Sequence, residues 1–174
     1  PYRFNWTAPL LISHHDPKTI YLAGNRVFKS TDRGETWTAS QDLTKNEDRD
    51  KIPIMGVTNP EEMLSRHDGV SFWGTISAFA ESPLSAQVLW AGTDDGNLQV
   101  TRDGGKTWVN VVDRLAGVPR NSYVAGIEAS HQAEGAAYVC FDRHRDDDFA
   151  PYILSTADFG QTWKSISGNL PAIG

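Results

Sequence analysis

Short apolar runs alternate with polar turns along the chain. Apolar residues precede each of three similar polar turns: Val27 and Phe28 before the first, Leu98 and Val100 before the second, and residues 152–154 before the third. Runs of this length between turn signals are typical of β-strands. The pattern therefore predicts three strands that each end in a turn.

The three turns have nearly the same sequence. Residues 30–37, 101–108 and 156–163 all read Ser/Thr-x-Asp-x-Gly-x-Thr-Trp. An Asp two residues before a Gly favours a turn, because the carboxylate accepts backbone N–H groups and Gly readily adopts a positive φ. Each copy is predicted to close a hairpin, with its Trp in the core. The residues expected to hold these turns are Asp32, Gly34, Trp37, Asp103, Gly105, Trp108, Asp158, Gly160 and Trp163.

The similarity extends upstream of the turns. Residues 12–24 resemble residues 79–92, and residues 127–141 keep the same two strands with a different turn between them. Repeats of four short strands are typical of propeller blades. We therefore predict an all-β fold, a partial β-propeller of about three four-stranded blades.

The blades are separated by one insertion. We expect a single partial propeller over residues 1–174, with blade 1 at about 1–44, the insertion at 45–73, blade 2 at about 74–118 and blade 3 at about 119–170. Three blades are fewer than the roughly four to eight that close a propeller. The expected partner is therefore the rest of a longer propeller chain, or a second copy. The inner strands of blades 2 and 3 are predicted at residues 74–80 and 123–128.

The insertion lies on a loop face, where binding residues are frequent. Residues 45–51 are charged and lack apolar periodicity, which predicts a loop. Asn59, followed by Pro60 and two acidic residues, predicts a short helix over residues 59–66.

Charge and cysteine content exclude some classes of function. The net charge is −6, and no basic stripe is interleaved with aromatic residues, so nucleic acid is not an expected partner. The single cysteine, Cys140, is expected to be a buried, unpaired thiol. No apolar run approaches the length of a membrane span.

The repeated motif resembles the Asp box, or BNR repeat. The segment from Arg3 through the first box, and residues 122–145, are similar to large bacterial secreted proteins of the sortilin-like or BNR-repeat glycosyl hydrolase type. The resemblance implies an extracytoplasmic protein that binds a polysaccharide or a peptide, or acts as a scaffold. One alternative it implies is part of a xyloglucanase- or sialidase-like glycoside hydrolase; another is an assembly factor for a membrane complex.

The densest polar cluster is residues 142–148. Asp142 and Asp146 are candidate catalytic acids, and Arg143, His144 and Arg145 are candidate binding residues. The interleaved arginines suit a carboxylate or sulfate ligand. A calcium ion bound at residues 142–148 is another hypothesis, although the acids do not stand at alternate positions as they do in a calcium-binding loop. We predict no other cofactor or metal site. A solvated charged face is the simplest alternative.

A second group of candidates precedes the inner strands. His67, Asp68 and Trp73 stand before one inner strand, and Tyr123 begins another. If the strands run outward from the axis, these residues share one mouth of the propeller and form a platform for sugar stacking with Asp68 as an acid. The alternative is that Trp73 packs between blades and Asp68 caps a hairpin.

The box aspartates are not catalytic candidates. A hydrolase needs two carboxylates in unlike surroundings, and the three boxes are alike. Sialidases contain an Arg-Ile-Pro segment, and the nearest match to it in this chain is Lys51-Ile52-Pro53. Xyloglucan-cleaving relatives instead use one Asp as acid and another as base, and neither is assigned by a motif in this chain.

Overall fold

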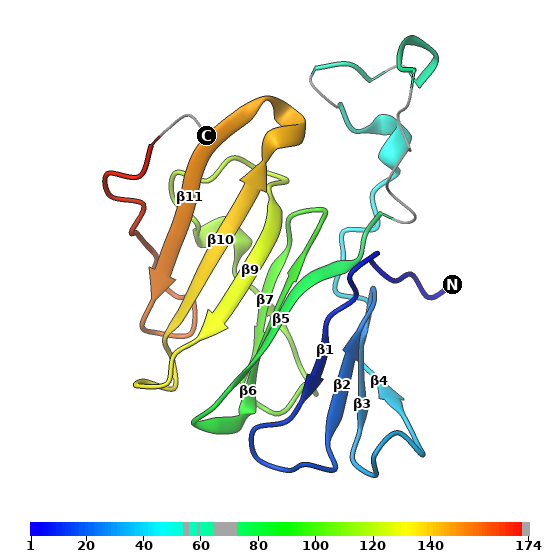
Figure 1. Cartoon of the computed structure of the whole chain (residues 1–174), viewed down its shortest axis with the longest axis vertical. Coiled ribbons are helices and arrows are strands. Elements are labelled where there is room, and N and C mark those ends of the chain that lie inside the picture. The colour runs from blue at the N-terminus through cyan, green and yellow to red at the C-terminus, as the bar shows by residue number, and fades with distance from the viewer. Residues whose placement is uncertain (54–55, 59, 65–72, 172–174) are drawn as a thin grey trace.

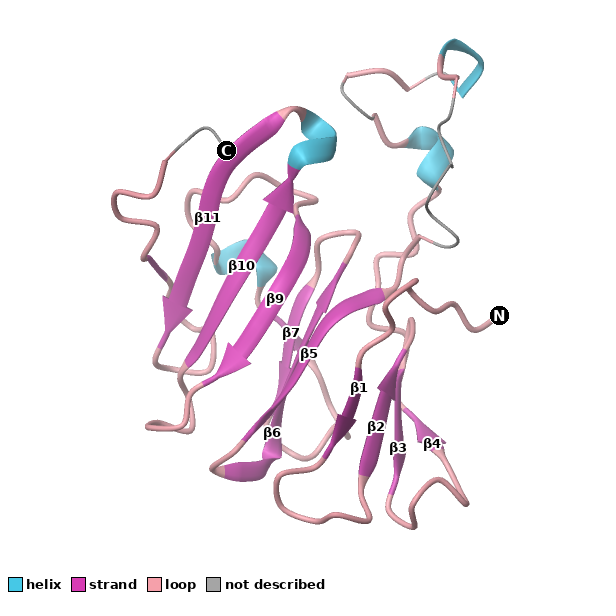
Figure 2. Cartoon of the chain, viewed as in Figure 1, coloured by secondary structure: helices cyan, strands magenta, loops and turns pink. Residues whose placement is uncertain are grey.

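The computed structural model describes residues 1–53, 56–58, 60–64 and 73–171. The fold is all-β, with three four-stranded antiparallel sheets (Figure 2). The strands of the first sheet are β1 (Leu10–Ile12), β2 (Ile20–Ala23), β3 (Val27–Ser30) and β4 (Thr38–Ala39). Those of the second are β5 (Ile76–Ser82), β6 (Ser85–Thr93), β7 (Leu98–Thr101) and β8 (Val109–Asn110). Those of the third are β9 (Tyr123–Ala129), β10 (Ala137–Arg143), β11 (Asp148–Thr156) and β12 (Lys164–Ser165).

Each sheet is a meander whose strands pair in chain order. The sheets stand side by side in the order first, second, third, with β5 and β9 of neighbouring sheets adjacent (Figure 1). We call these sheets blades 1, 2 and 3. This arrangement confirms the predicted fold class of a partial propeller with three four-stranded blades.

Outside the strands, the described residues form four 3-10 turns: η1 (Arg49–Lys51), η2 (Pro60–Glu62), η3 (Val112–Arg114) and η4 (His144–Asp146). The helix predicted over residues 59–66 is therefore reduced to the single turn η2, while Asn59 and residues 65–66 lie outside the described residues. Among the described residues, no helix is long and apolar enough to cross a membrane.

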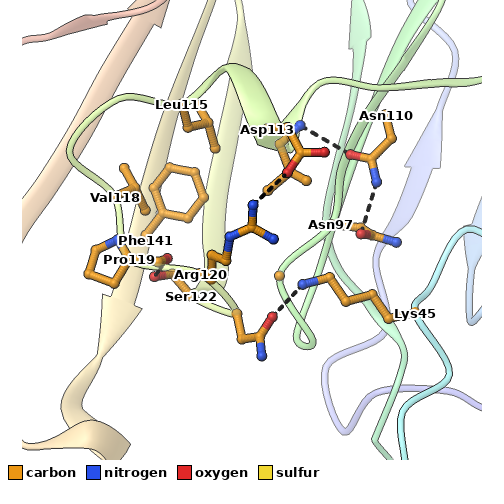
Figure 3. Close-up of a pocket in the computed structure, with 13 residues that line it drawn as sticks. Lys45, Asn97, Asn110, Asp113, Leu115, Val118, Pro119, Arg120, Ser122 and Phe141 are labelled. Atoms are coloured by element: carbon orange, nitrogen blue, oxygen red, sulfur yellow. Dashed lines mark hydrogen bonds and ion pairs between the residues drawn. The ribbon is translucent and has the colours of Figure 1, made fainter.

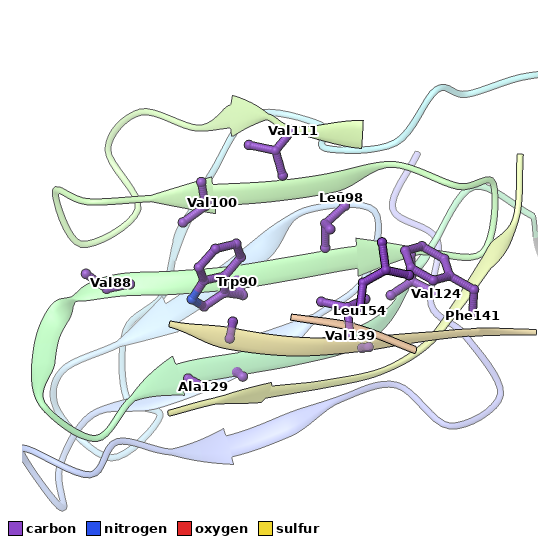
Figure 4. Packing of buried hydrophobic residues seen from close by; sticks show 13 residues of the cluster. Val88, Trp90, Leu98, Val100, Val111, Val124, Ala129, Val139, Phe141 and Leu154 are labelled. Carbon is purple, nitrogen blue, oxygen red and sulfur yellow. The ribbon is translucent and has the colours of Figure 1, made fainter. Parts of the chain in front are cut away.

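The core lies between the blades. Blades 2 and 3 enclose the larger cluster, in which the fully buried Trp90 packs among valines, leucines and alanines (Figure 4). A second cluster joins blade 1 to blade 2 through Tyr21, Leu43 and Leu89. Because the blades bury their apolar faces against one another, this packing holds the three blades together as one unit.

Each box holds its turn by local hydrogen bonds. In the second box, the Asp103 carboxylate accepts from Thr101 Oγ1 (2.7 Å), Thr107 N (2.9 Å) and Thr107 Oγ1 (2.6 Å). Gly105 has a φ of 94°, which an L side chain adopts only with strain. The Thr36 hydroxyl and backbone bonds lower the pKa of Asp32 to about 2, so the box carboxylate is stabilised as an anion.

The three box tryptophans differ in burial. Trp108 is 9% exposed and packs in the cluster between blades 1 and 2, and Trp163 contacts Trp90 edge to face with ring centroids 6.1 Å apart. Trp37 was expected in the core but is 42% exposed. The second and third tryptophans pack against the preceding blade, whereas no blade of the described residues lies against Trp37. Cys140 is likewise half-buried rather than buried, although its thiol is unpaired as predicted.

Candidate functional site

A cavity of about 250 Å³ opens where the insertion meets blades 2 and 3. Its lining comes from the insertion, the turn after β6, the start of β9 and the turn between β10 and β11. The lining residues are Arg49, Pro53, Trp73, Asp94, Asn121, Tyr123, Asp142, Arg143, His144, Arg145 and Asp146. This cavity, which we call the mouth cavity, thus contains every candidate catalytic or binding residue that lies within the described part of the chain. His67 and Asp68 are not among the described residues.

The turn between β10 and β11 is built from ion pairs. Arg143 binds Asp146 (Nη2 to Oδ2, 3.1 Å) and Asp148 (Nε to Oδ2, 3.0 Å). His144 Nδ1 lies 2.5 Å from Asp142 Oδ2. The hydrogen bond from the Tyr152 hydroxyl, followed by smaller contributions that include Arg143, lowers the pKa of Asp148. Asp142, Asp146 and Asp148 are therefore engaged by neighbouring side chains, and the turn presents its arginines beside them.

Asp94 is a buried carboxylate that the sequence analysis missed. It is 2% exposed and follows β6. It accepts hydrogen bonds from Gly74 N (3.0 Å), Thr75 N (2.8 Å) and Thr75 Oγ1 (2.6 Å). Burial raises the pKa of Asp94 to about 6, against its ordinary value of 3.8, although these hydrogen bonds oppose the shift. A carboxyl group that titrates near neutrality in a cavity is a candidate for proton transfer.

Two aromatic side chains border the same cavity. Arg49 lies over the Trp73 ring, with its guanidinium carbon 5.3 Å from the ring centroid. Burial, followed by the negative charge of Asp94, raises the pKa of Tyr123, which indicates that the phenol lies within the field of Asp94. Trp73 Nε1 is buried and has no hydrogen-bond partner among the described residues. The ring that was expected either to pack between blades or to line the mouth therefore lines the mouth cavity.

The wall formed by the insertion is attached to blade 2 by backbone contacts. Asp95, which is fully buried, accepts hydrogen bonds from Lys45 N (2.8 Å) and Asn46 N (3.2 Å). On the blade 1 side, Arg3 Nε donates to Gly74 O (3.1 Å), and Arg3 Nη2 lies 3.3 Å from Asp42 Oδ2. The adjacent acids Asp94 and Asp95 thus have different roles. Asp95 binds the backbone of the insertion, and Asp94 lines the cavity. The sequence does contain a signal for these two residues: they are adjacent acids between an apolar strand and Gly96.

No group of three or more His, Cys, Asp or Glu side chains is arranged to hold a metal ion in the described part of the chain. In residues 142–148, the carboxylates of Asp142, Asp146 and Asp148 face His144 and Arg143 instead.

The sequence matches the BNR/Asp-box repeat model at residues 28–39, which span the first box. The chain is 27% identical over 168 residues to an oligoxyloglucan-reducing end-specific xyloglucanase of Emericella nidulans, a match that covers 93% of the chain and 18% of that protein. It is 28% identical over 164 residues to a probable enzyme of the same name from Neosartorya fischeri, covering 88% of the chain and 17% of that protein. The chain thus spans less than a fifth of the length of these curated relatives.

Solved structures show the same fold. The GH74 enzyme of Niastella koreensis superposes with a TM-score of 0.58 at 19% identity, over 92% of the chain and 22% of the enzyme. YCF48 bound to D1 peptide superposes with a TM-score of 0.53 at 16% identity, over 94% of the chain and 42% of that protein. The chain therefore carries the BNR/Asp-box repeat, and it resembles part of a β-propeller of the kind found in GH74 xyloglucanases and YCF48.

Proposed function

We propose that the chain contributes a polysaccharide-binding and cleavage site to an Asp-box propeller of the glycoside hydrolase type. The observation that carries this proposal is the mouth cavity, which brings Trp73 and Tyr123 together with Asp94 and Asp142, two of its three carboxylates, in unlike surroundings. Aromatic faces beside polar groups suit sugar rings, which are apolar on their faces and polar at their edges.

The two carboxylates differ as an acid and a base must. Asp94 is buried and holds its proton until near neutrality, whereas the Asp142 side chain is 40% exposed and lies beside His144. We assign Asp94 as the general acid, which protonates the glycosidic oxygen as the bond to the sugar breaks. Asp142 is assigned as the base, which takes a proton from the water that attacks the sugar carbon.

The sequence relatives support this class of function. Both curated relatives are named as xyloglucanases, and the similarity covers nearly the whole chain. A polysaccharide ligand also fits the extracytoplasmic location that the family resemblance implies, and that location is part of the proposal.

The test measures both binding and cleavage. Binding of xyloglucan oligosaccharides is followed by calorimetry, and cleavage by the release of new reducing ends. Asp94→Asn and Asp142→Asn are each expected to lower the rate roughly 100-fold or more while binding remains. Trp73→Ala is expected to weaken binding, because it removes the stacking surface.

Glu134→Gln is the matched control, because Glu134 is an exposed acid in the turn between β9 and β10. Cleavage that is unchanged in both aspartate variants would refute the catalytic assignment. Binding of oligosaccharides without any cleavage by the wild-type chain would leave only the binding role.

A further inference from the structure

Among the described residues, Arg145 is a cation of the mouth cavity that has no bonded partner, and the cavity is also lined by the carboxylates of Asp94, Asp142 and Asp146. Arg143 binds two acids of its own turn, and Asp142 is bound by His144. Arg145 lines the cavity and is half-buried, and it forms no hydrogen bond or ion pair with any residue that the structure describes. A partly desolvated guanidinium without a partner is a strong site for an anion.

A second cavity, of about 360 Å³, adjoins the mouth cavity. Asn121 lines both cavities, and Lys45 Nζ lies 2.5 Å from Asn121 Oδ1. Figure 3 shows Leu115, Val118, Pro119 and Phe141 on one side of this second cavity and Lys45 and Asn97 on the other, with the Arg120 side chain between them and directed toward Asp113. The two cavities therefore meet at Asn121, where an extended ligand would have to pass to contact both.

The second cavity also offers a cation to a ligand. Arg120 Nη2 lies 3.6 Å from Asp113 Oδ1, and these side chains are 91% and 83% exposed. An exposed ion pair of this kind is weak, because water solvates both charges well. A ligand carboxylate or sulfate can therefore replace Asp113 at little cost.

We propose that the two cavities form one groove that binds an acidic polysaccharide. One sugar stacks between Trp73 and Tyr123 and places its carboxylate or sulfate against Arg145. A neighbouring sugar places its charge near Arg120 and Lys45. A planar guanidinium binds such groups through paired hydrogen bonds, which gives selectivity over neutral sugars. This inference rests on the proposed function, because it names the substrate class of the same site.

The experiment compares three ligands of equal length by titration calorimetry: a neutral xyloglucan oligosaccharide, an oligogalacturonate and a sulfated oligosaccharide. At least one acidic ligand is expected to bind about tenfold tighter than the neutral one, and the preference should shrink at high salt. The two acidic ligands distinguish carboxylate from sulfate. Arg145→Gln is expected to remove most of this preference, lowering the ratio of neutral to acidic Kd by up to about tenfold.

Two further variants and a control separate recognition from folding. Arg145→Glu should reverse the preference by repelling the acidic ligand, and Arg120→Gln should reduce it less than Arg145→Gln does. Lys164→Gln is the matched control, because it removes one exposed positive charge on β12. Thermal unfolding of each variant shows whether a loss of preference reflects a loss of the fold.

The outcomes distinguish the two proposals. If neutral and acidic oligosaccharides bind equally, or if the Arg145 variants keep the preference, the acidic groove is refuted while the proposed function stands. If no oligosaccharide binds, both proposals fail. Binding of an acidic peptide in place of every oligosaccharide would also overturn both and would identify the site as a peptide site.

Discussion

Replacing Asp94 by Asn is expected to stabilise the chain at neutral pH. The Asp94 side chain is buried, and burial raises its pKa from the ordinary 3.8 to about 6. Between these values the folded chain binds a proton that the unfolded chain releases. The free energy of unfolding therefore falls as the pH rises from about 4 to about 6, and then stays level with respect to this group.

The size of the effect follows from the two pKa values. Their difference corresponds to about 3 kcal/mol of stability lost between acid and neutral pH. An asparagine carries no charge and avoids this loss. Its side-chain oxygen can still accept from Gly74 N and Thr75 N, and its amide can donate to Thr75 Oγ1, which has acceptor capacity of its own. The substitution therefore preserves the local contacts while removing the buried charge.

The assay is urea unfolding of the wild type and Asp94→Asn, followed by tryptophan fluorescence across this pH range. The two chains should be similar in stability near pH 4, and the variant should be more stable by up to about 3 kcal/mol near pH 7. All other carboxylates are common to both chains, so their titration cancels in the difference. Asp113→Asn is the control, because the same substitution there removes an exposed carboxylate. A stability difference that stays constant with pH would refute the argument.

Three other substitutions test the packing and the boxes. Glu81→Ala should destabilise the chain by about 3 kcal/mol or more in urea unfolding, because the buried carboxylate accepts hydrogen bonds from three donors of blade 1. Glu81→Gln should cost less stability. Equal losses in the two variants would argue against these hydrogen bonds. Asp103→Ala should lower the midpoint temperature of thermal unfolding, because it removes the hydrogen bonds of the box carboxylate. The neighbouring Lys106→Ala should leave that midpoint unchanged. An unchanged midpoint in both variants would show that the box carboxylate does not stabilise the fold. Gly92→Ala should cost about 1–3 kcal/mol, because an added Cβ would lie 2.2 Å from Val124 Cγ1. A second substitution, Val124→Ala, should recover part of that loss, and no recovery would place the strain elsewhere.

Part of the candidate site was predictable from the sequence. Residues 142–148 stood out as a dense polar run, and Trp73 and Tyr123 stood out as aromatics at the starts of inner strands. Asp94 did not stand out, because its importance arises from burial and from bonds to Gly74 and Thr75 in another strand region. Its unusual pKa is a property of the assembled blades that composition and spacing do not reveal.

The sequence by itself determined the architecture. Each box makes its main contacts within eight residues, from Ser30 to Trp37 in the first copy, so the motif specifies the same hairpin wherever it occurs. Repetition of a local unit then predicts stacked blades.

Only the tertiary structure decided which residues share a site and which box tryptophans are buried. The mouth cavity collects Arg49, Asp94 and Asp142 from three separate segments, because neighbouring blades place their loops at one end. Trp37 and Trp108 occupy the same position in similar motifs, yet among the described residues only Trp108 is covered by a neighbouring blade. Burial and proximity depend on what the rest of the fold brings alongside a residue, and a local pattern carries no information about that neighbour.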